Sequence, residues 1–69
     1  MKFKIAFRLI GEREAVRSDV FEANSILEAS HRHGEQWNNH FAFSDRFRSV
    51  LYLFETASRR WKRLETINW

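Results

Sequence analysis

A strict alternation of apolar and polar side chains near the start of the chain is the feature that most limits its fold. Over residues 2–10, the large apolar side chains of Phe3, Ile5, Phe7 and Leu9 alternate with Lys2, Lys4, Ala6 and Arg8. A period of two places every second side chain on the same face of an extended segment. The pattern therefore predicts a strand over residues 2–10 with one buried face and one face in water.

The core has to be held together by packing alone. The chain has 69 residues and no cysteine, which excludes a disulfide and a thiolate metal site. A domain of this size buries only about 60% of the surface that its unfolded chain exposes. Seven Phe, three Trp and one Tyr supply the large side chains for packing. We expect one folded domain over residues 1–69.

A second strand is expected over residues 15–23, with a less regular pattern. Val16 and Val20 share one parity, whereas Phe21 belongs to the other. A bulge, or a strand covered on both faces, would reconcile the two sets. The short polar link that contains Gly11 favours antiparallel pairing with the first strand.

A capping box predicts the start of a helix at Ser25. Its hydroxyl can accept from the backbone N–H of Glu28, whose carboxylate can reach back to the N–H of Ser25. A single stripe of side chains follows at helical spacing: Ile26, Ala29, Ser30, His33 and Trp37. We expect Asn38–Asn39 to end the helix.

Two further strands are expected after an apolar connection over residues 41–45. Residues 46–55 contain an apolar run that is typical of a central strand. Residues 56–59 read as a hairpin loop, and residues 60–67 as a fourth strand with Trp61 among its anchors. The order β-β-α-β-β predicts an α+β fold, with a four-stranded, mostly antiparallel sheet and one helix packed on a face. The other face of the sheet would be open.

Basic charge is concentrated in the second half of the chain. Residues 1–35 carry six basic and six acidic side chains, whereas residues 36–69 carry six basic and three acidic ones, a net charge of +3. Arginine can contact phosphate or carboxylate with two parallel hydrogen bonds. The candidate binding residues are Arg46, Arg48, Arg59, Arg60, Trp61, Lys62 and Arg63.

The run over residues 59–63 has three interpretations. It can contact phosphates of DNA or RNA, with Trp61 stacking on a base. It can protect an edge strand from pairing with another sheet, or it can meet an acidic protein surface. If Lys2, Lys4 and Arg8 share the open face with the later arginines, the basic surface grows to nine groups.

The histidines give weak support for catalysis or metal binding. His31 and His33 are two residues apart on the expected helix and point about 200° apart, so they cannot share a metal. A ribonuclease-type toxin would use His31 or His40 as the base, with Glu35 as partner. We expect no catalytic residue, no metal ligand and no cofactor, and a purified protein without stoichiometric metal.

Residues 20–29, VFEANSILEA, resemble an element of small phage proteins in which a strand end leads directly into a capped helix. Together with the β-β-α-β-β order, this segment resembles a small type I-F anti-CRISPR family. The resemblance implies a compact inhibitor that binds a CRISPR surveillance complex and blocks DNA hybridisation. It transfers no functional residue to this chain.

The first expectation is therefore a non-enzymatic binding protein, an inhibitor encoded by a phage or mobile element that sterically blocks a host protein or ribonucleoprotein complex. The alternatives are a small nucleic-acid-binding domain and the ribonuclease-type toxin. No signal peptide is expected, because Arg8 interrupts the first apolar stretch. We expect no membrane contact and a location in the cytoplasm of the host cell.

Overall fold

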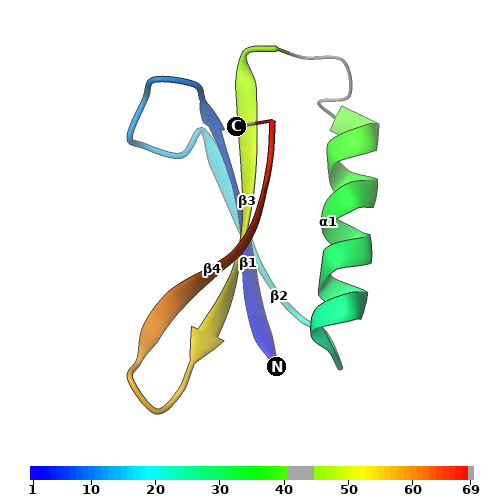
Figure 1. Ribbon diagram of the computed structural model, residues 1–69, viewed down its shortest axis with the longest axis vertical. Helices are drawn as coiled ribbons and strands as arrows, with labels where there is room; N and C mark the ends of the chain where they lie inside the picture. The colour runs from blue at the N-terminus through cyan, green and yellow to red at the C-terminus, as the bar shows by residue number, and fades with distance from the viewer. Residues whose placement is uncertain (41–44, 69) are drawn as a thin grey trace.

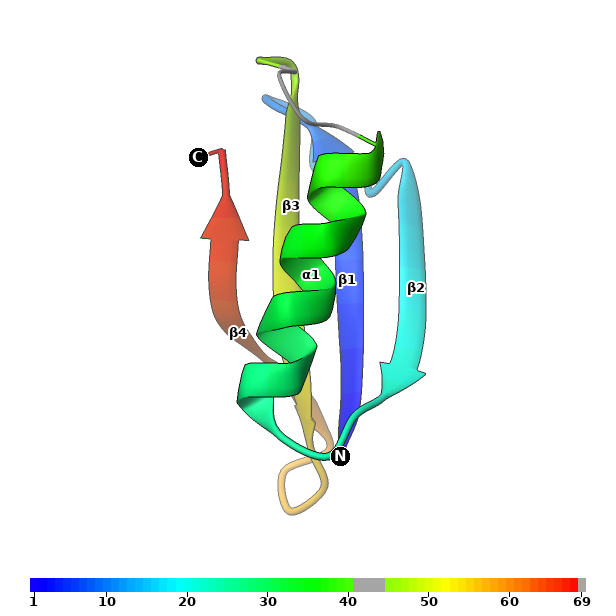
Figure 2. The same ribbon diagram turned by 90° about the vertical axis from the view of Figure 1, so that its right-hand side faces the viewer.

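The protein is a four-stranded antiparallel sheet with one helix lying across a single face (Figures 1 and 2). The structure is a computed structural model and describes residues 1–40 and 45–68. Its elements are β1 (Lys2–Leu9), β2 (Arg17–Glu22), α1 (Ile26–His40), β3 (Phe47–Glu55) and β4 (Arg60–Ile67). The predicted α+β fold and the β-β-α-β-β order are confirmed. In the described part of the chain, no helix is long and apolar enough to span a membrane.

The strands lie in the order β2-β1-β3-β4, so β1 and β3 are central and β2 and β4 form the edges. Two connections, over residues 10–16 and 56–59, join the antiparallel strands of the two hairpins. Each connection contains a residue with positive φ. Gly11, in the β1–β2 connection, has φ +95°, and Arg59, at the end of the β3–β4 connection, has φ 55°. Helix α1 carries the chain from one edge to the central strand β3 (Figure 2).

The core fills the space between α1 and the sheet. Phe3, Ile5 and Phe7 of β1 are buried there, together with Ala29 of α1 and Leu51 of β3. The alternation in β1 therefore has the predicted effect on these three residues. Leu9, the next member of the pattern, is 37% exposed at the end of the strand.

The pattern of β2 needs neither the bulge nor the strand covered on both faces that the sequence left open. The strand begins at Arg17 and pairs with β1 without a register shift, so Val16 lies outside it. Phe21 is opposite Phe3 and faces α1, whereas Val20 is opposite Lys4 and faces away. The register shift occurs between β3 and β4, at Leu51/Tyr52.

The helix begins as the capping box predicts, with one difference. The N–H of Glu28 donates to Ser25 Oγ at 3.1 Å, but the Glu28 carboxylate accepts from the N–H of Asn24, at 2.9 Å, rather than from Ser25. The helix continues to His40. Ile26 is 47% exposed, so it does not belong to the buried stripe. Most of the expected apolar connection, including Phe41 and Phe43, lies outside the described residues.

Candidate functional site

The face of the sheet opposite α1 collects basic and aromatic side chains from three strands. Because Phe3, Ile5 and Phe7 point toward α1, their neighbours in β1 point away from it. The ladder places Tyr52 opposite Lys4 and, on its other side, opposite Arg63. We call the resulting set the basic-aromatic face: Lys2, Lys4, Arg8, Arg48, Tyr52, Phe54, Trp61 and Arg63.

Negative charge is scarce on this face. The strand residues that point away from α1 include five basic side chains and one acidic side chain, Glu22. Glu22 lies at the β2 edge, where its carboxylate is 3.4 Å from the amino group of Met1. The strands β1, β3 and β4 contribute no acidic side chain to this face, so the surface across them is positive.

Two lysines lie over the aromatic rings. Lys4 Nζ is 4.6 Å from the Trp61 ring centroid and 4.9 Å from that of Tyr52. Lys2 Nζ is 5.0 Å from the Phe54 ring, which packs edge-on against Trp61 at 5.1 Å. These are cation–π distances, and they require each ammonium to lie above a ring face rather than beside it. The two ammonium groups therefore cover faces of the Tyr52, Phe54 and Trp61 rings.

Arg8 and Arg48 stand directly opposite each other across β1 and β3. Arg8 donates to the backbone oxygen of Arg13 at 3.0 Å and to the Tyr52 hydroxyl at 3.3 Å. The Nε atoms of both arginines are buried without a hydrogen-bond partner among the described residues. Like charges opposite each other on a sheet are destabilising unless an anion lies between them. The pair is therefore suited to an anionic group.

The basic run over residues 59–63 is divided between the two faces. Trp61 and Arg63 belong to the basic-aromatic face, whereas Arg60 and Lys62 are opposite Glu55 and Leu53, on the α1 side. Arg59 lies in the hairpin loop. Alternation along β4 causes this division, and it means that the predicted run is not one continuous patch.

The condition for a basic surface of nine groups is met only in part, because Arg60 and Lys62 lie on the α1 side. Arg46 precedes β3, which begins at Phe47, and its backbone oxygen accepts from the N–H of Ile10 at 2.8 Å. The sequence interpretation also missed Tyr52 and Phe54, which it assigned to an apolar run. Val50, Tyr52 and Phe54 are spaced two residues apart, and this spacing indicates that they share one face of the strand.

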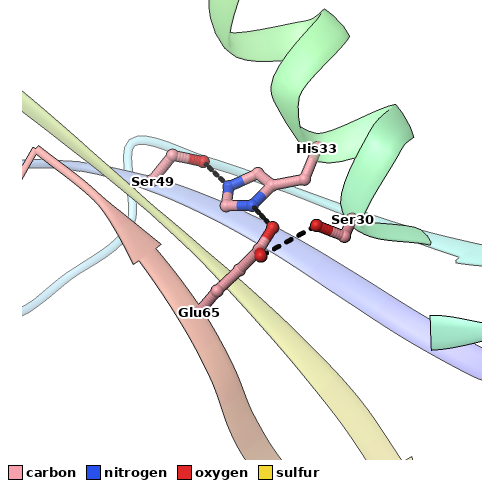
Figure 3. A network of polar contacts seen from close by, with 4 residues as sticks. All are labelled: Ser30, His33, Ser49 and Glu65. Atoms are coloured by element: carbon pink, nitrogen blue, oxygen red, sulfur yellow. Dashed lines mark hydrogen bonds and ion pairs between the residues drawn. The ribbon is translucent and has the colours of Figure 1, made fainter. Parts of the chain in front are cut away.

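A second polar cluster lies between α1 and the sheet (Figure 3). His33 Nδ1 is 2.8 Å from Glu65 Oε1, and His33 Nε2 is 2.6 Å from Ser49 Oγ. Ser30 donates to the other carboxylate oxygen of Glu65 at 2.9 Å. Since a carboxylate only accepts, Nδ1 carries the proton toward Glu65, and in the neutral ring Nε2 accepts from Ser49.

The hydrogen bonds of this cluster connect its residues as in a Ser-His-acid triad, but a substrate cannot reach them. His33 and Ser49 are both 0% exposed. A nucleophilic serine must present its oxygen to a substrate carbonyl next to an oxyanion-stabilising site. Ser49 Oγ instead lies beneath α1, so the cluster satisfies buried polar groups.

The register shift explains how Glu65 reaches the helix. Arg63 faces away from α1 opposite Tyr52, and strict alternation would return Glu65 to that same face. At the irregularity, Leu64 packs against the core and Glu65 lies opposite the buried Leu51. An extra residue in one strand re-aims the side chains that follow it. The sequence analysis placed His33 in the helical stripe but missed Glu65 and Ser49 as its partners, and the structure buries His33 completely.

The other histidines lie on or near the outer surface of α1. His31 Nδ1 is 3.5 Å from Glu35 Oε1, and both side chains are mostly exposed. Because α1 covers the opposite side of the sheet, this pair is remote from the arginines of the basic-aromatic face (Figure 1). Within residues 1–40 and 45–68, no group of three or more His, Asp or Glu side chains is arranged to hold a metal.

Comparison of the chain with models of protein families, with curated proteins and with solved structures finds no match.

Proposed function

We propose that this protein binds nucleic acid on the basic-aromatic face of its sheet and acts by binding alone. The observation that carries the proposal is the interleaving of Lys2, Lys4 and Arg63 with the rings of Tyr52 and Trp61 on one exposed surface. Cationic side chains contribute affinity for phosphates by releasing counterions. Aromatic ring faces add a surface on which bases stack.

The rings favour nucleic acid over an acidic protein surface as the partner. Carboxylates on a protein surface need only the cations, and they gain little from the faces of aromatic rings. Tyr52, Phe54 and Trp61 are half-buried rather than fully covered by the fold. The Arg8–Arg48 pair adds a position for a phosphate, because guanidinium groups bind phosphate with two parallel hydrogen bonds.

The absence of catalysis is part of the proposal. Its support is the burial of Ser49 and His33, a nucleophile–base pair whose two side chains are both 0% exposed. The His31–Glu35 pair lies on the helix side, away from the cations that would hold an RNA phosphate.

The inhibitor function stays a prediction. A small phage or mobile-element protein in the host cytoplasm can block a ribonucleoprotein complex by occupying the nucleic acid that the complex needs. A basic surface is complementary to that nucleic acid rather than to the basic groove that holds it. Inhibition of a CRISPR surveillance complex would thus require the same face, and variants of that face would test it.

The test compares two neighbouring residues on opposite faces of β4. Binding of a labelled mixed-sequence oligonucleotide is measured over a range of salt concentrations for wild type, Arg63→Ala and Lys62→Ala. Arg63→Ala should weaken binding and reduce the slope of log K against log salt by about 0.7 to 0.9, the value of one phosphate contact. Lys62→Ala should leave the slope unchanged. No binding at low salt, or equal effects of the two variants, would contradict the proposal.

A further inference from the structure

We propose that the basic-aromatic face selects single-stranded nucleic acid, and that Lys2 and Lys4 cap its rings until unpaired bases replace them. This inference rests on the proposed function and specifies its ligand. It starts from the positions of the two ammonium groups, which lie over the rings of Tyr52, Phe54 and Trp61.

The caps occupy the positions that stacked bases would take. Lys4 Nζ lies over two rings at once, at 4.6 Å from Trp61 and 4.9 Å from Tyr52, and Lys2 Nζ also lies 5.9 Å from Trp61. A base stacks on the same ring face that a cation prefers. Base and ammonium therefore compete for each ring, and binding requires the lysines to move.

The exchange is favourable for a single strand. Stacking of a base on an aromatic ring contributes more than a cation–π contact at an exposed site. The lysine side chains are long and flexible, so a displaced Nζ can turn to a phosphate of the same strand. Each lysine then exchanges a ring for a phosphate, while the base takes its place on the ring.

A duplex cannot make this exchange. Its bases are stacked on one another, and only its phosphates are available to a flat surface. Helix α1 lies on the other side of the sheet, so it cannot enter a groove from the basic-aromatic face (Figure 1). Stacking of unpaired bases on aromatic side chains of an open four-stranded sheet is an established mode of single-strand recognition.

The first experiment compares ligands. A mixed-sequence single-stranded oligonucleotide and its duplex are titrated into the protein at the same salt concentration. The single strand should bind more tightly. In Trp61→Leu, affinity for the single strand should fall by between about fivefold and about 150-fold, the range for loss of one stacked base, with little change for the duplex. A melting curve checks that the variant is folded.

The second experiment keeps the native Trp61 and so does not depend on the folding of that variant. Trp37→Phe combined with Trp69→Phe leaves Trp61 as the sole tryptophan, and its emission should be quenched by the single strand but not by the duplex. In the free protein, Lys4→Ser should expose Trp61 to quenching by acrylamide, whereas Lys62→Ser should not.

The outcomes separate the two proposals. Equal affinity for single strand and duplex, without quenching of Trp61, would overturn the single-strand inference and leave nucleic-acid binding in place. Absence of binding to both ligands would overturn both proposals. An unchanged response of Trp61 to acrylamide in Lys4→Ser would overturn the capping role of that lysine.

Discussion

Glu65 and His33 join the edge strand β4 to helix α1 through a contact of 2.8 Å between Oε1 and Nδ1. The histidine is 0% exposed, whereas the glutamate is 36% exposed. His33 has both ring nitrogens hydrogen-bonded, one of them to Ser49. Since buried polar groups are costly when left without partners, each member of this network depends on the others.

Glu65→Ala should lower the free energy of unfolding by about 1–3 kcal/mol, because it leaves a buried imidazole N–H without an acceptor. Urea denaturation measures the change. Glu35→Ala is the matched control, since Glu35 contacts His31 at 3.5 Å on the exposed surface of α1. Exposed pairs of this kind contribute at most about 0.5 kcal/mol. Equal losses in the two variants would show that the buried network contributes no more than a surface pair.

Phe7→Ala and Ser25→Ala compare the core with the helix cap. Phe7 of β1 is 1% exposed and packs in the core between the sheet and α1, so its truncation should lower the free energy of unfolding by about 3–5 kcal/mol. Ser25→Ala removes the hydrogen bond from the N–H of Glu28 and should cost about 1 kcal/mol. Chemical denaturation of both variants gives the comparison. A loss in Phe7→Ala no greater than that in Ser25→Ala would contradict the central position of Phe7.

The two glycines should respond to alanine in opposite directions. Gly34 lies within α1 and an added Cβ would meet no atom within 4 Å, so Gly34→Ala should stabilise the protein by about 0.5–1 kcal/mol. Gly11 also has space for a Cβ, but its φ of +95° is unfavourable for alanine. Gly11→Ala should therefore destabilise the protein by about 1 kcal/mol or more. Melting temperatures of both variants test the difference in sign.

The architecture could be predicted because local patterns carry it. Alternation in β1 and the capping hydrogen bond at Ser25 depend on residues close together in the sequence. Strand order could not be predicted in this way, because the neighbouring strands β1 and β3 are separated in the sequence by β2 and α1. Without that order, the position of Arg48 opposite Arg8 could not be known.

The candidate site was predicted only in part, because the face on which each side chain lies depends on strand pairing rather than on local sequence. The density of basic residues near the second hairpin predicts a binding run over residues 59–63, but the pleat of β4 places Arg60 and Lys62 on the α1 side. The shift at Leu51/Tyr52 is also invisible in the sequence, because nothing in a strand pattern marks where an extra residue will be accommodated. That shift determines that Glu65 reaches His33 rather than the open face.

Arg48→Met should raise the stability of the free protein and lower its affinity for nucleic acid. Arg48 stands opposite Arg8, and its Nε is buried without a partner among the described residues. Methionine keeps an apolar stem and removes the like-charge pair, so stability at low salt should rise by about 0.5 kcal/mol. Added salt should reduce this gain, because it screens the repulsion in the wild type.

Arg60→Met is the control for Arg48→Met, since it removes the same side chain from the other face. Arg60 is opposite Glu55, an opposite charge, so its replacement should leave stability unchanged or reduce it by about 0.5 kcal/mol or less. Binding should separate the two variants as well, because only Arg48→Met removes a cation from the basic-aromatic face. Urea denaturation at low and high salt, with an oligonucleotide titration of each variant, measures both effects. A stability loss in Arg48→Met with unchanged nucleic-acid affinity would mean that the Arg8–Arg48 pair serves packing and not an anionic ligand.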